Sequence, residues 1–145
     1  MGISQLNIRR AGLQDATALA RLLGQMEYAQ DLVQLKIRLQ QLLDHPQELL
    51  LVAELEQQAC AFLSMHFIPQ LALAGDFARI SYFCVDEALR GQQIGAQLLH
   101  YAEQQAKARG CDRMELHSAT YRMGAHRFYF SQGYEESPKY LIKKL

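Results

Sequence analysis

The sequence of 145 residues lacks tryptophan and has no excess of charge, since fifteen lysines and arginines balance fifteen aspartates and glutamates. A protein without net charge has no long-range field that attracts a polyanion. Proteins that bind DNA or RNA carry a basic patch or a high isoelectric point, and anionic membranes attract the same kind of charge. We therefore expect neither a nucleic-acid partner nor a membrane partner.

Cysteine is scarce. Cys60, Cys84 and Cys111 are the three in the chain, and no two have the spacing of a CxxC motif. An odd number of widely spaced cysteines in apolar sequence argues against a disulfide framework, so we expect free buried thiols. The five histidines form no HExxH motif and no cluster with cysteine. Zinc sites need such groups, so we expect no metal.

Long apolar runs are also missing. The runs 49–53 and 59–65 are far shorter than the ~20 residues of a membrane-spanning helix. The first residues lack the pattern of a signal peptide, so we expect a cytoplasmic protein. No internal repeat or linker divides the chain, and a chain of this length can bury one core. We therefore expect a single domain over residues 1–145.

The sequence does contain a regular order of hydrophobic patterns. Alternating apolar residues predict strands, and recurrence every three or four residues predicts helices. The expected strands are 6–10, 48–55, 58–68, 78–85, 114–117 and 140–144. The expected helices are 19–26, 32–43, 95–109 and 124–132. Glu56-Gln57 is short enough for a hairpin turn, and Asp15 favours the positive end of the first helix. This order predicts an α/β fold in which an antiparallel meander leads into a strand-helix-strand unit.

A polar loop with two glycines leads from the strand that ends at Val85 into the helix that begins at Gly95. The N–H groups at a helix start have no partner inside the helix, and the helix dipole adds about half a positive charge there. Glycine lets the backbone approach a phosphate closely, and Arg90 can add bidentate contacts. The loop is therefore a candidate anion site. The alternative is that Gly91 and Gly95 serve only as turn and packing residues.

This segment resembles motif A of the GNAT superfamily of N-acetyltransferases, which is usually written R-G-x-G-I-G within V-D-x-x-x-R-G. The residues that match the motif are Arg90, Gly91, Ile94 and Gly95. Gln93 stands where the motif has its middle glycine. A side chain at this position either weakens the binding of coenzyme A or points to solvent and leaves the binding intact.

A second segment, residues 125–134, is similar to the family's A-x-x-F-Y-x-x-x-G pattern followed by Phe or Tyr. The two motifs occur in the family's order, separated by a helix and a strand. Further similarity covers nearly the whole chain, at residues 8–11, 15–16, 25–28, 115–118 and 137–145. The resemblance implies a single-domain fold with a mixed, mostly antiparallel sheet. This sheet is splayed between its fourth and fifth strands, flanked by about four helices, and holds acetyl-coenzyme A in the opening.

The resemblance also implies transfer of an acetyl group from acetyl-coenzyme A to a primary amine, by direct attack through a tetrahedral intermediate. Tyr129 matches the family's general acid, which gives a proton to the departing thiolate. The residues that the resemblance assigns to cofactor binding are Phe83, Cys84, Val85, Arg90, Gly91, Gln92, Gln93, Ile94, Gly95, Ala96 and Phe128.

Two of these residues have alternative roles. Cys84 invites a covalent acetyl-enzyme, but no histidine or basic residue adjoins it in sequence to lower the thiol pKa, so direct attack is favoured. Phe128 belongs to an aromatic pair on a helix, and such a residue is also suited to the core.

Neither motif assigns the general base. Relatives often carry a glutamate on the strand before motif A, but this sequence has Ser81 there, with Arg79 two residues earlier. Glu115 and His117 alternate along the next strand, so they share one face and either can take a proton, directly or through water. His117 is the candidate base, and a structural, hydrogen-bonded histidine is the alternative.

The acceptor pocket is expected between the end of the first helix and the meander. Its candidate residues are Tyr28, Asp31, His66 and Tyr82, with Phe83 beside them. Asp31 can attract an ammonium group. The acceptor is a small molecule or a peptide amine, and polyamines, aminoglycosides, amino acids, peptide N-termini and protein lysines all stay open, because variable loops build such pockets.

Three other functions are compatible with the sequence. One is a non-catalytic module that binds an acyl-coenzyme A without turnover. The second is an enzyme that uses a longer acyl donor, and the third is a structural dimerisation domain that binds no coenzyme A. A homodimer is open in each case, because dimers are common among similar proteins.

Overall fold

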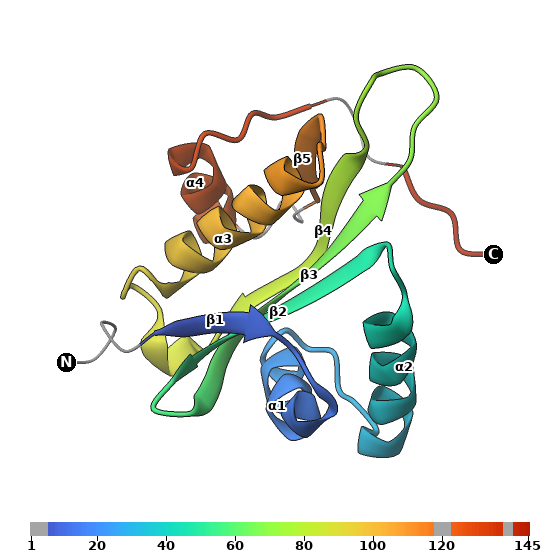
Figure 1. Cartoon of the computed structure of the whole chain (residues 1–145). Helices are drawn as coiled ribbons and strands as arrows, with labels where there is room; N and C mark the ends of the chain where they lie inside the picture. Colours follow the sequence, from blue (N-terminus) through green and yellow to red (C-terminus); the bar gives the residue numbers. More distant parts are fainter. Residues whose placement is uncertain (1–5, 118–122, 138–140) are drawn as a thin grey trace. The chain divides into compact units, whose positions relative to one another are not determined.

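The computed structural model describes residues 6–117, 123–137 and 141–145 (Figure 1). The chain divides into two compact units, Met1–Glu115 and Leu116–Leu145. Among the described residues, none of the helices has the length and apolar character needed to cross a membrane.

Five strands form one sheet, in the order in which they occur in the chain. They are β1 (Asn7–Arg10), β2 (Glu48–Leu55), β3 (Gln58–Ile68), β4 (Phe77–Val85) and β5 (Arg113–Leu116). β1 to β4 pair antiparallel, and β5 lies parallel to β4. The predicted α/β fold with a mixed, mostly antiparallel sheet is therefore confirmed, whereas the splay between the fourth and fifth strands stays a prediction.

The β2–β3 hairpin has the bounds that the sequence predicts. Glu56 and Gln57 connect the two strands with φ of 51° and 66°. Positive φ at both central residues is the geometry of a type I′ turn, whose twist matches that of the flanking strands. Glutamate and glutamine do not favour positive φ as glycine does. The pairing of the apolar strands on both sides therefore holds the turn in this conformation.

A β-bulge changes the register within this hairpin. The shift lies between Ala53 and Glu54 of β2. A ladder continued from the turn without the bulge would place Glu48 opposite Met65. With the bulge, Glu48 lies opposite His66. Because the side-chain period of a strand is two residues, this one-residue shift decides which side chains share a face.

A second bulge lies between β3 and β4. Tyr82 lies opposite Ser64, and Ile80 lies opposite Met65, so Ser81 is the extra residue on β4. A bulged residue has no partner on the neighbouring strand. Its side chain therefore departs from the regular alternation of side chains between the two faces of the sheet. Ser81 and Tyr82 can therefore face the same side of the sheet although they are neighbours in sequence.

Two helices cover one face of the sheet and a third covers the other face (Figure 1). α1 (Ala16–Gln25) and α2 (Leu32–Asp44) share the first face, and α3 (Ile94–Ala108) packs on the opposite face against β2, β3 and β4. All three helices were expected from their periodicity. α2 ends before His45-Pro46, as predicted, because proline restricts the residue that precedes it.

Apolar side chains fill both layers between helices and sheet. The buried cluster under α1 and α2 includes Leu19, Leu22, Leu39, Leu50, Val52, Phe62 and Cys84. The buried residues of α3 are Ile94, Leu98, Leu99, Ala102 and Ala106. Full burial of one leucine or phenylalanine side chain contributes about 1.5–3 kcal/mol, so these two layers fix the position of the sheet between the helices.

Asp15 lies just before α1, as expected, and forms a buried ion pair. Arg9 donates to its two carboxylate oxygens at 2.8 and 2.9 Å, and the backbone N–H of Gly12 donates to it at 2.8 Å. Arg9 also donates to Glu54 of β2 at 3.1 Å. Burial raises the pKa of Asp15, but the hydrogen bonds from Arg9 and Gly12 outweigh burial and hold the pKa below its usual range. The ion pair thus ties β1, β2 and the start of α1 together.

The second unit contains α4 (Met123–Ser131), one residue from the predicted bounds of 124–132. The predicted final strand, 140–144, is wrong for the residues that the structure describes, since 141–144 have no regular structure. Leu141 and Ile142 are 84% and 75% exposed. A strand is stable only when a neighbouring strand pairs with it, and these exposed residues have neither pairing nor burial. Tyr140 lies outside the described residues.

Candidate functional site

The loop from β4 to α3 has a backbone suited to a close approach by a ligand. Gly91 has φ of 85°, and Gln93, the residue before α3, has φ of 67° and ψ of 7°. This left-handed conformation is the one that glycine adopts at no cost. Gln93 therefore adopts a backbone conformation that suits the glycine of the motif, although it carries a side chain.

The start of α3 presents backbone N–H groups. The first hydrogen bond of this helix start runs from Gln97 N to Gln93 O at 3.1 Å, so the N–H groups of Ile94, Gly95 and Ala96 precede the ladder. The side chain of Ile94 is buried in the core, and Gln93 is exposed. The helix end combines these N–H groups with the positive end of the dipole, which is the chemistry that binds a phosphate.

Arg90 lies in the same loop with an exposed side chain. Its Nε donates to the carbonyl oxygen of Val85 at 3.2 Å, which holds the guanidinium close to the end of β4. A β-carbon at Gly91 would meet nothing within 4 Å, so the space beside this glycine is open. The residues present thus fit the pyrophosphate of a coenzyme A molecule in charge and in access.

Hydrogen bonds to Asp86 hold the first residues of this loop in place. Its carboxylate accepts hydrogen bonds from Ala88 N at 3.1 Å, from Arg21 of α1 at 2.6 Å and from Gln25 at 3.3 Å. The Ala88 N–H and then Arg21 hold the pKa of Asp86 below its usual range. The side chain of Gln25 in turn accepts from Glu87 N at 3.0 Å. The end of α1 therefore supports the first turn of the loop.

The three residues that lead into the loop differ in exposure. Phe83 and Val85 are half-buried, whereas Cys84 is buried under α1, where its thiol lies 3.6 Å from the carbonyl oxygen of Leu22. Burial raises the pKa of Cys84, so the thiol stays protonated near neutral pH. A buried protonated thiol is a poor nucleophile.

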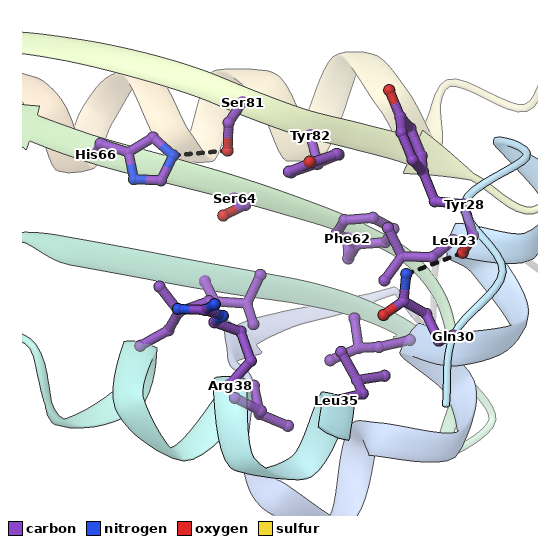
Figure 2. A pocket seen from close by; sticks show the side chains of 14 residues that line it. Leu23, Tyr28, Gln30, Leu35, Arg38, Phe62, Ser64, His66, Ser81 and Tyr82 are labelled. Atoms are coloured by element: carbon purple, nitrogen blue, oxygen red, sulfur yellow. Dashed lines mark hydrogen bonds between the residues drawn. The ribbon is translucent and has the colours of Figure 1, made fainter. Parts of the chain in front are cut away.

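A pocket of about 390 Å³ lies between the sheet and the α1–α2 pair (Figure 2). Its lining residues are Leu19, Leu23, Tyr28, Gln30, Leu35, Arg38, Leu39, Leu42, Leu50, Phe62, Ser64, His66, Ser81 and Tyr82. Seven of these residues are leucine or phenylalanine, and each of the other seven carries a polar group. A volume of this size and lining is typical of a site for a small molecule.

Three of the four predicted acceptor residues line this pocket: Tyr28, His66 and Tyr82. The rings of Tyr28 and Tyr82 meet edge to face, with centroids 5.4 Å apart and an interplanar angle of 88°. The fourth residue, Asp31, is not among the lining residues. Its carboxylate accepts the N–H of Val33 at 2.9 Å and caps the start of α2.

Two further residues, which sequence reasoning did not assign to the site, hold the imidazole of His66. Its Nδ1 lies 2.5 Å from Oε1 of Glu48. Its Nε2 lies 2.6 Å from Oγ of Ser81, and a dashed line marks this second contact in Figure 2. The two bulges produce this arrangement, since one brings Glu48 opposite His66 and the other turns Ser81 toward the pocket. Arg38 lines the pocket from α2 and is also new to the site.

The two base candidates from the sequence have separate surroundings. Glu115 on β5 accepts hydrogen bonds from Arg79 of β4 at 2.8 and 3.2 Å, so an ion pair occupies its carboxylate. His117 follows β5, belongs to the second unit and is exposed. Its role as a base stays a prediction.

The second motif forms part of α4. The ring of Tyr129 lies 5.4 Å from that of Phe128 and 6.0 Å from that of Tyr134, both edge to face. Phe128 and Tyr129 are half-buried. This aromatic group restricts the rotation of the Tyr129 side chain, as a positioned acid requires, and the role of Tyr129 stays a prediction.

No group of three or more histidine, cysteine, aspartate or glutamate side chains is arranged to hold a metal ion within residues 6–117, 123–137 and 141–145. The cysteines Cys60, Cys84 and Cys111 are thiols.

Comparison with known proteins gives a relative with a named activity. The chain is 36% identical over 80 residues to the aminoalkylphosphonate N-acetyltransferase of Salmonella typhimurium. The match covers 55% of this chain and 52% of the relative, so it spans about half the length of that protein.

Two solved structures have the same fold. A transcriptional regulator from Bacillus halodurans is 26% identical, with a TM-score of 0.89 and coverage of 97% of this chain and 99% of that chain. A GNAT family acetyltransferase from Staphylococcus aureus is 21% identical, with a TM-score of 0.84 and the same coverage. The model of the acetyltransferase (GNAT) family matches residues 15–134, which include both motifs. The protein is therefore a member of the GNAT family of acetyltransferases.

Proposed function

We propose that this chain is an N-acetyltransferase that transfers the acetyl group of acetyl-coenzyme A to a small amine by direct attack, with residues 1–145 acting as one domain. The observation that carries the proposal is the position of β4 between two sites. Its end leads into the loop at Arg90 and Gly91, and its middle contributes Ser81 and Tyr82 to the pocket. A donor on the loop and an acceptor in the pocket would meet along one strand.

The donor site rests on the loop geometry. Acetyl-coenzyme A is the acetyl donor of the family. The N–H groups of Gly95 and Ala96, the open backbone at Gly91 and the guanidinium of Arg90 would hold its pyrophosphate. The backbone of Cys84 and Val85 would bind the pantetheine arm. The protonated state of the Cys84 thiol favours direct attack over a covalent acetyl-enzyme.

The acceptor site favours an amine that also carries an anionic group. The relative from Salmonella typhimurium is named for aminoalkylphosphonates, which combine an amine with a phosphonate. In the pocket, Arg38 supplies a cation on the α2 side and His66 lies on the sheet side (Figure 2). A phosphonate or carboxylate on Arg38 would direct the amine of a short molecule toward β4.

The first experiment is titration calorimetry with acetyl-coenzyme A on the parent protein and on Arg90→Ala. Loss of one charge-assisted contact is expected to weaken binding about 10- to 100-fold. Micromolar binding that falls in the variant supports the donor site. Failure of the parent protein to bind acetyl-coenzyme A would overturn the proposal.

The second experiment measures amine-dependent release of coenzyme A with 2-aminoethylphosphonate and with propylamine, which lacks the anion. The phosphonate is expected to have the lower KM, and Arg38→Met should remove this difference while Lys36→Met, on the same helix outside the pocket, should not. Tight binding of acetyl-coenzyme A without any amine-dependent release would favour a non-catalytic binding module instead.

A further inference from the structure

We infer that Glu48, His66 and Ser81 form the proton-accepting chain that deprotonates the acceptor amine. This inference rests on the proposed acetyl transfer and adds the general base, which neither motif supplies. The three side chains come from three adjacent strands, β2, β3 and β4. His66 and Ser81 line the pocket in which the amine would lie.

The direction of the hydrogen bonds follows from chemistry. An ionised carboxylate only accepts, so Nδ1 of His66 carries the hydrogen that points to Glu48 at 2.5 Å. In a neutral ring the other nitrogen, Nε2, is then an acceptor, and it receives the hydroxyl hydrogen of Ser81 at 2.6 Å. Glu48 thus fixes the tautomer that makes Nε2 basic, and it stabilises the imidazolium that forms when Nε2 takes a proton.

Burial and exposure also fit a relay. The side chain of Glu48 is 17% exposed and that of His66 is 27% exposed, whereas Ser81 is on the surface of the pocket. The hydroxyl is the outer end of the chain, and the carboxylate is the inner end. A structural histidine needs partners too, but it does not need an accessible hydroxyl that faces an apolar pocket large enough for a substrate.

The charged groups around His66 come from each neighbouring element. β2 contributes Glu48, and β4 contributes Arg79, which lies opposite His66 in the ladder and is paired with Glu115 of β5. From α2, Arg38 lines the same pocket. The phenol groups that line this pocket belong to Tyr28 and Tyr82. With Arg79 neutralised by Glu115, Glu48 is the charged group in hydrogen-bond contact with the imidazole.

The proposed step moves a proton from the acceptor ammonium through Ser81 to His66. The ammonium of the acceptor gives a proton to Oγ of Ser81, while Ser81 gives its own hydroxyl proton to Nε2 of His66. The neutral amine then uses its lone pair to form a C–N bond with the acetyl carbonyl carbon, and the C–S bond breaks. The nitrogen loses its second proton as the tetrahedral intermediate collapses, and the departing thiolate of coenzyme A takes up one proton. The imidazolium of His66 returns the first proton to solvent, so one proton is released for each acetyl group transferred.

The position of the chain relative to the thioester is consistent with this step. A strand rises about 3.3 Å per residue, so Ser81 lies about 10 Å before Cys84 along β4. The amine nitrogen must lie about 3 Å from both the Ser81 hydroxyl and the acetyl carbon, so the pantetheine arm held at Cys84 and Val85 would extend the thioester back along β4 toward Ser81.

The test compares kcat, KM and the pH dependence of kcat/KM in His66→Gln, Ser81→Ala and the parent protein, with 2-aminoethylphosphonate as the amine. General bases contribute about 100- to 10,000-fold, so His66→Gln should lower kcat by about 100-fold or more and leave the Kd of acetyl-coenzyme A unchanged. The loss should shrink at high pH, where the amine is already neutral. Ser81→Ala should lose less, because a water can replace the hydroxyl. His100→Gln, exposed on α3, is the matched control and should behave as the parent protein does.

The outcomes separate this inference from the proposed function. If the folded parent protein acetylates no amine, the proposed function fails and the relay fails with it. If the parent protein is active and His66→Gln keeps its turnover and its pH profile, the relay alone is overturned. Mass spectrometry that finds an acetyl group on Ser81 during turnover would also overturn it. Melting curves confirm folding, and Ser81→Ala, at an exposed position, tests the relay even if His66→Gln unfolds.

Discussion

The guanidinium of Arg21 donates to the carboxylate of Asp86 at 2.6 Å and so joins the first helix to the residue that follows β4. The same carboxylate receives the backbone N–H of Ala88. The first turn of the β4–α3 loop therefore depends on one ionised side chain that is held from two sides.

Replacement of Asp86 by alanine should destabilise the loop. Loss of a capping carboxylate costs about 1 kcal/mol, and loss of the partner of Arg21 adds to it. We expect a fall of about 1–2 kcal/mol in the free energy of unfolding in urea, together with weaker binding of acetyl-coenzyme A. Glu87→Ala, an exposed neighbour, should stay within about 0.5 kcal/mol of the parent protein. Equal stability of the two variants would contradict the role of Asp86.

The Arg9–Asp15 ion pair should make stability depend on acid. The pKa of Asp15 is lowered in the folded state, so its contribution is complete above the ordinary aspartate pKa of about 3.9 and is lost as the pH falls through the folded value. The free energy of unfolding should be level between pH 7 and 5 and decline below about pH 4.

Arg9→Met should lower the free energy of unfolding near neutral pH and reduce its decline in acid. The variant leaves a buried carboxylate without its cation, at a cost of about 2–3 kcal/mol. Burial then raises the pKa of Asp15 with less opposition. The folded value therefore approaches or passes the unfolded value, and the loss of stability that Asp15 causes below about pH 4 should shrink or disappear. Arg10→Met, the exposed neighbour, should keep the parent profile. Urea unfolding at a series of pH values measures both effects, and identical profiles for Arg9→Met and the parent protein would refute the prediction.

Replacement by alanine should lower the stability of the fold at one glycine and raise it at another. A β-carbon at Gly75 would lie 2.5 Å from the carbonyl oxygen of Gly110 and 2.8 Å from Asp112 N, so Gly75→Ala should destabilise by about 1–3 kcal/mol. At Gly24, in α1, a β-carbon would meet nothing within 4 Å. Gly24→Ala should stabilise by about 0.4–1 kcal/mol, because alanine has less freedom in the unfolded chain. Thermal unfolding of both variants tests the pair, and a stable Gly75→Ala would mean that the loop moves freely.

Gln93 and its neighbour Gln92 form a second matched pair. Gln93 has φ of 67°, where glycine is unstrained, so Gln93→Gly should remain within about 0.5 kcal/mol of the parent protein. Gln92 does not have a positive φ, so Gln92→Gly should lose about 0.4–1 kcal/mol through the greater freedom of the unfolded chain. Titration of both variants with acetyl-coenzyme A shows in addition whether the Gln93 side chain hinders binding. A large loss of stability in Gln93→Gly would show that its side chain supports the loop.

Tyr129→Phe should lower kcat by about 100-fold while the Kd of acetyl-coenzyme A stays unchanged, since a general acid acts on the departing thiolate and not on binding. Tyr134→Phe is the control, because the motif accepts either aromatic residue at that position. Equal losses in kcat and in affinity for Tyr129→Phe would remove Tyr129 from the role of acid.

Sequence alone predicts the β2–β3 hairpin to its end residues because apolar alternation and a two-residue turn are local features. It does not predict which side chains face one another across that hairpin. An unbroken register places Glu48 opposite Met65, and only the bulge at Ala53 and Glu54 places it opposite His66. The hydrogen-bond chain of the pocket was therefore hidden, although all three of its residues are plainly polar.

For Asp31, by contrast, the sequence did contain the information needed to predict its structural role. An aspartate directly before the apolar periodicity of a helix is a common N-cap, and the structure uses Asp31 in that way. The left-handed conformation at Gln93, by contrast, follows only from the motif's glycine at that place, because glutamine itself has no preference for it. The prediction of a final strand at residues 140–144 was wrong for a different reason. A segment forms a strand only where a neighbouring strand is available to pair with it, and the segment's own sequence does not show this.

Ser81 has no partner across the ladder, and this has a consequence for how related sequences diverge. Each paired position of β3 and β4 is constrained by the residue that faces it, so a change there must be matched elsewhere. A change at Ser81 leaves every pair between β3 and β4 in place. The strand thus offers one position, at the edge of the pocket, where chemistry can vary from one lineage to the next with little penalty to folding.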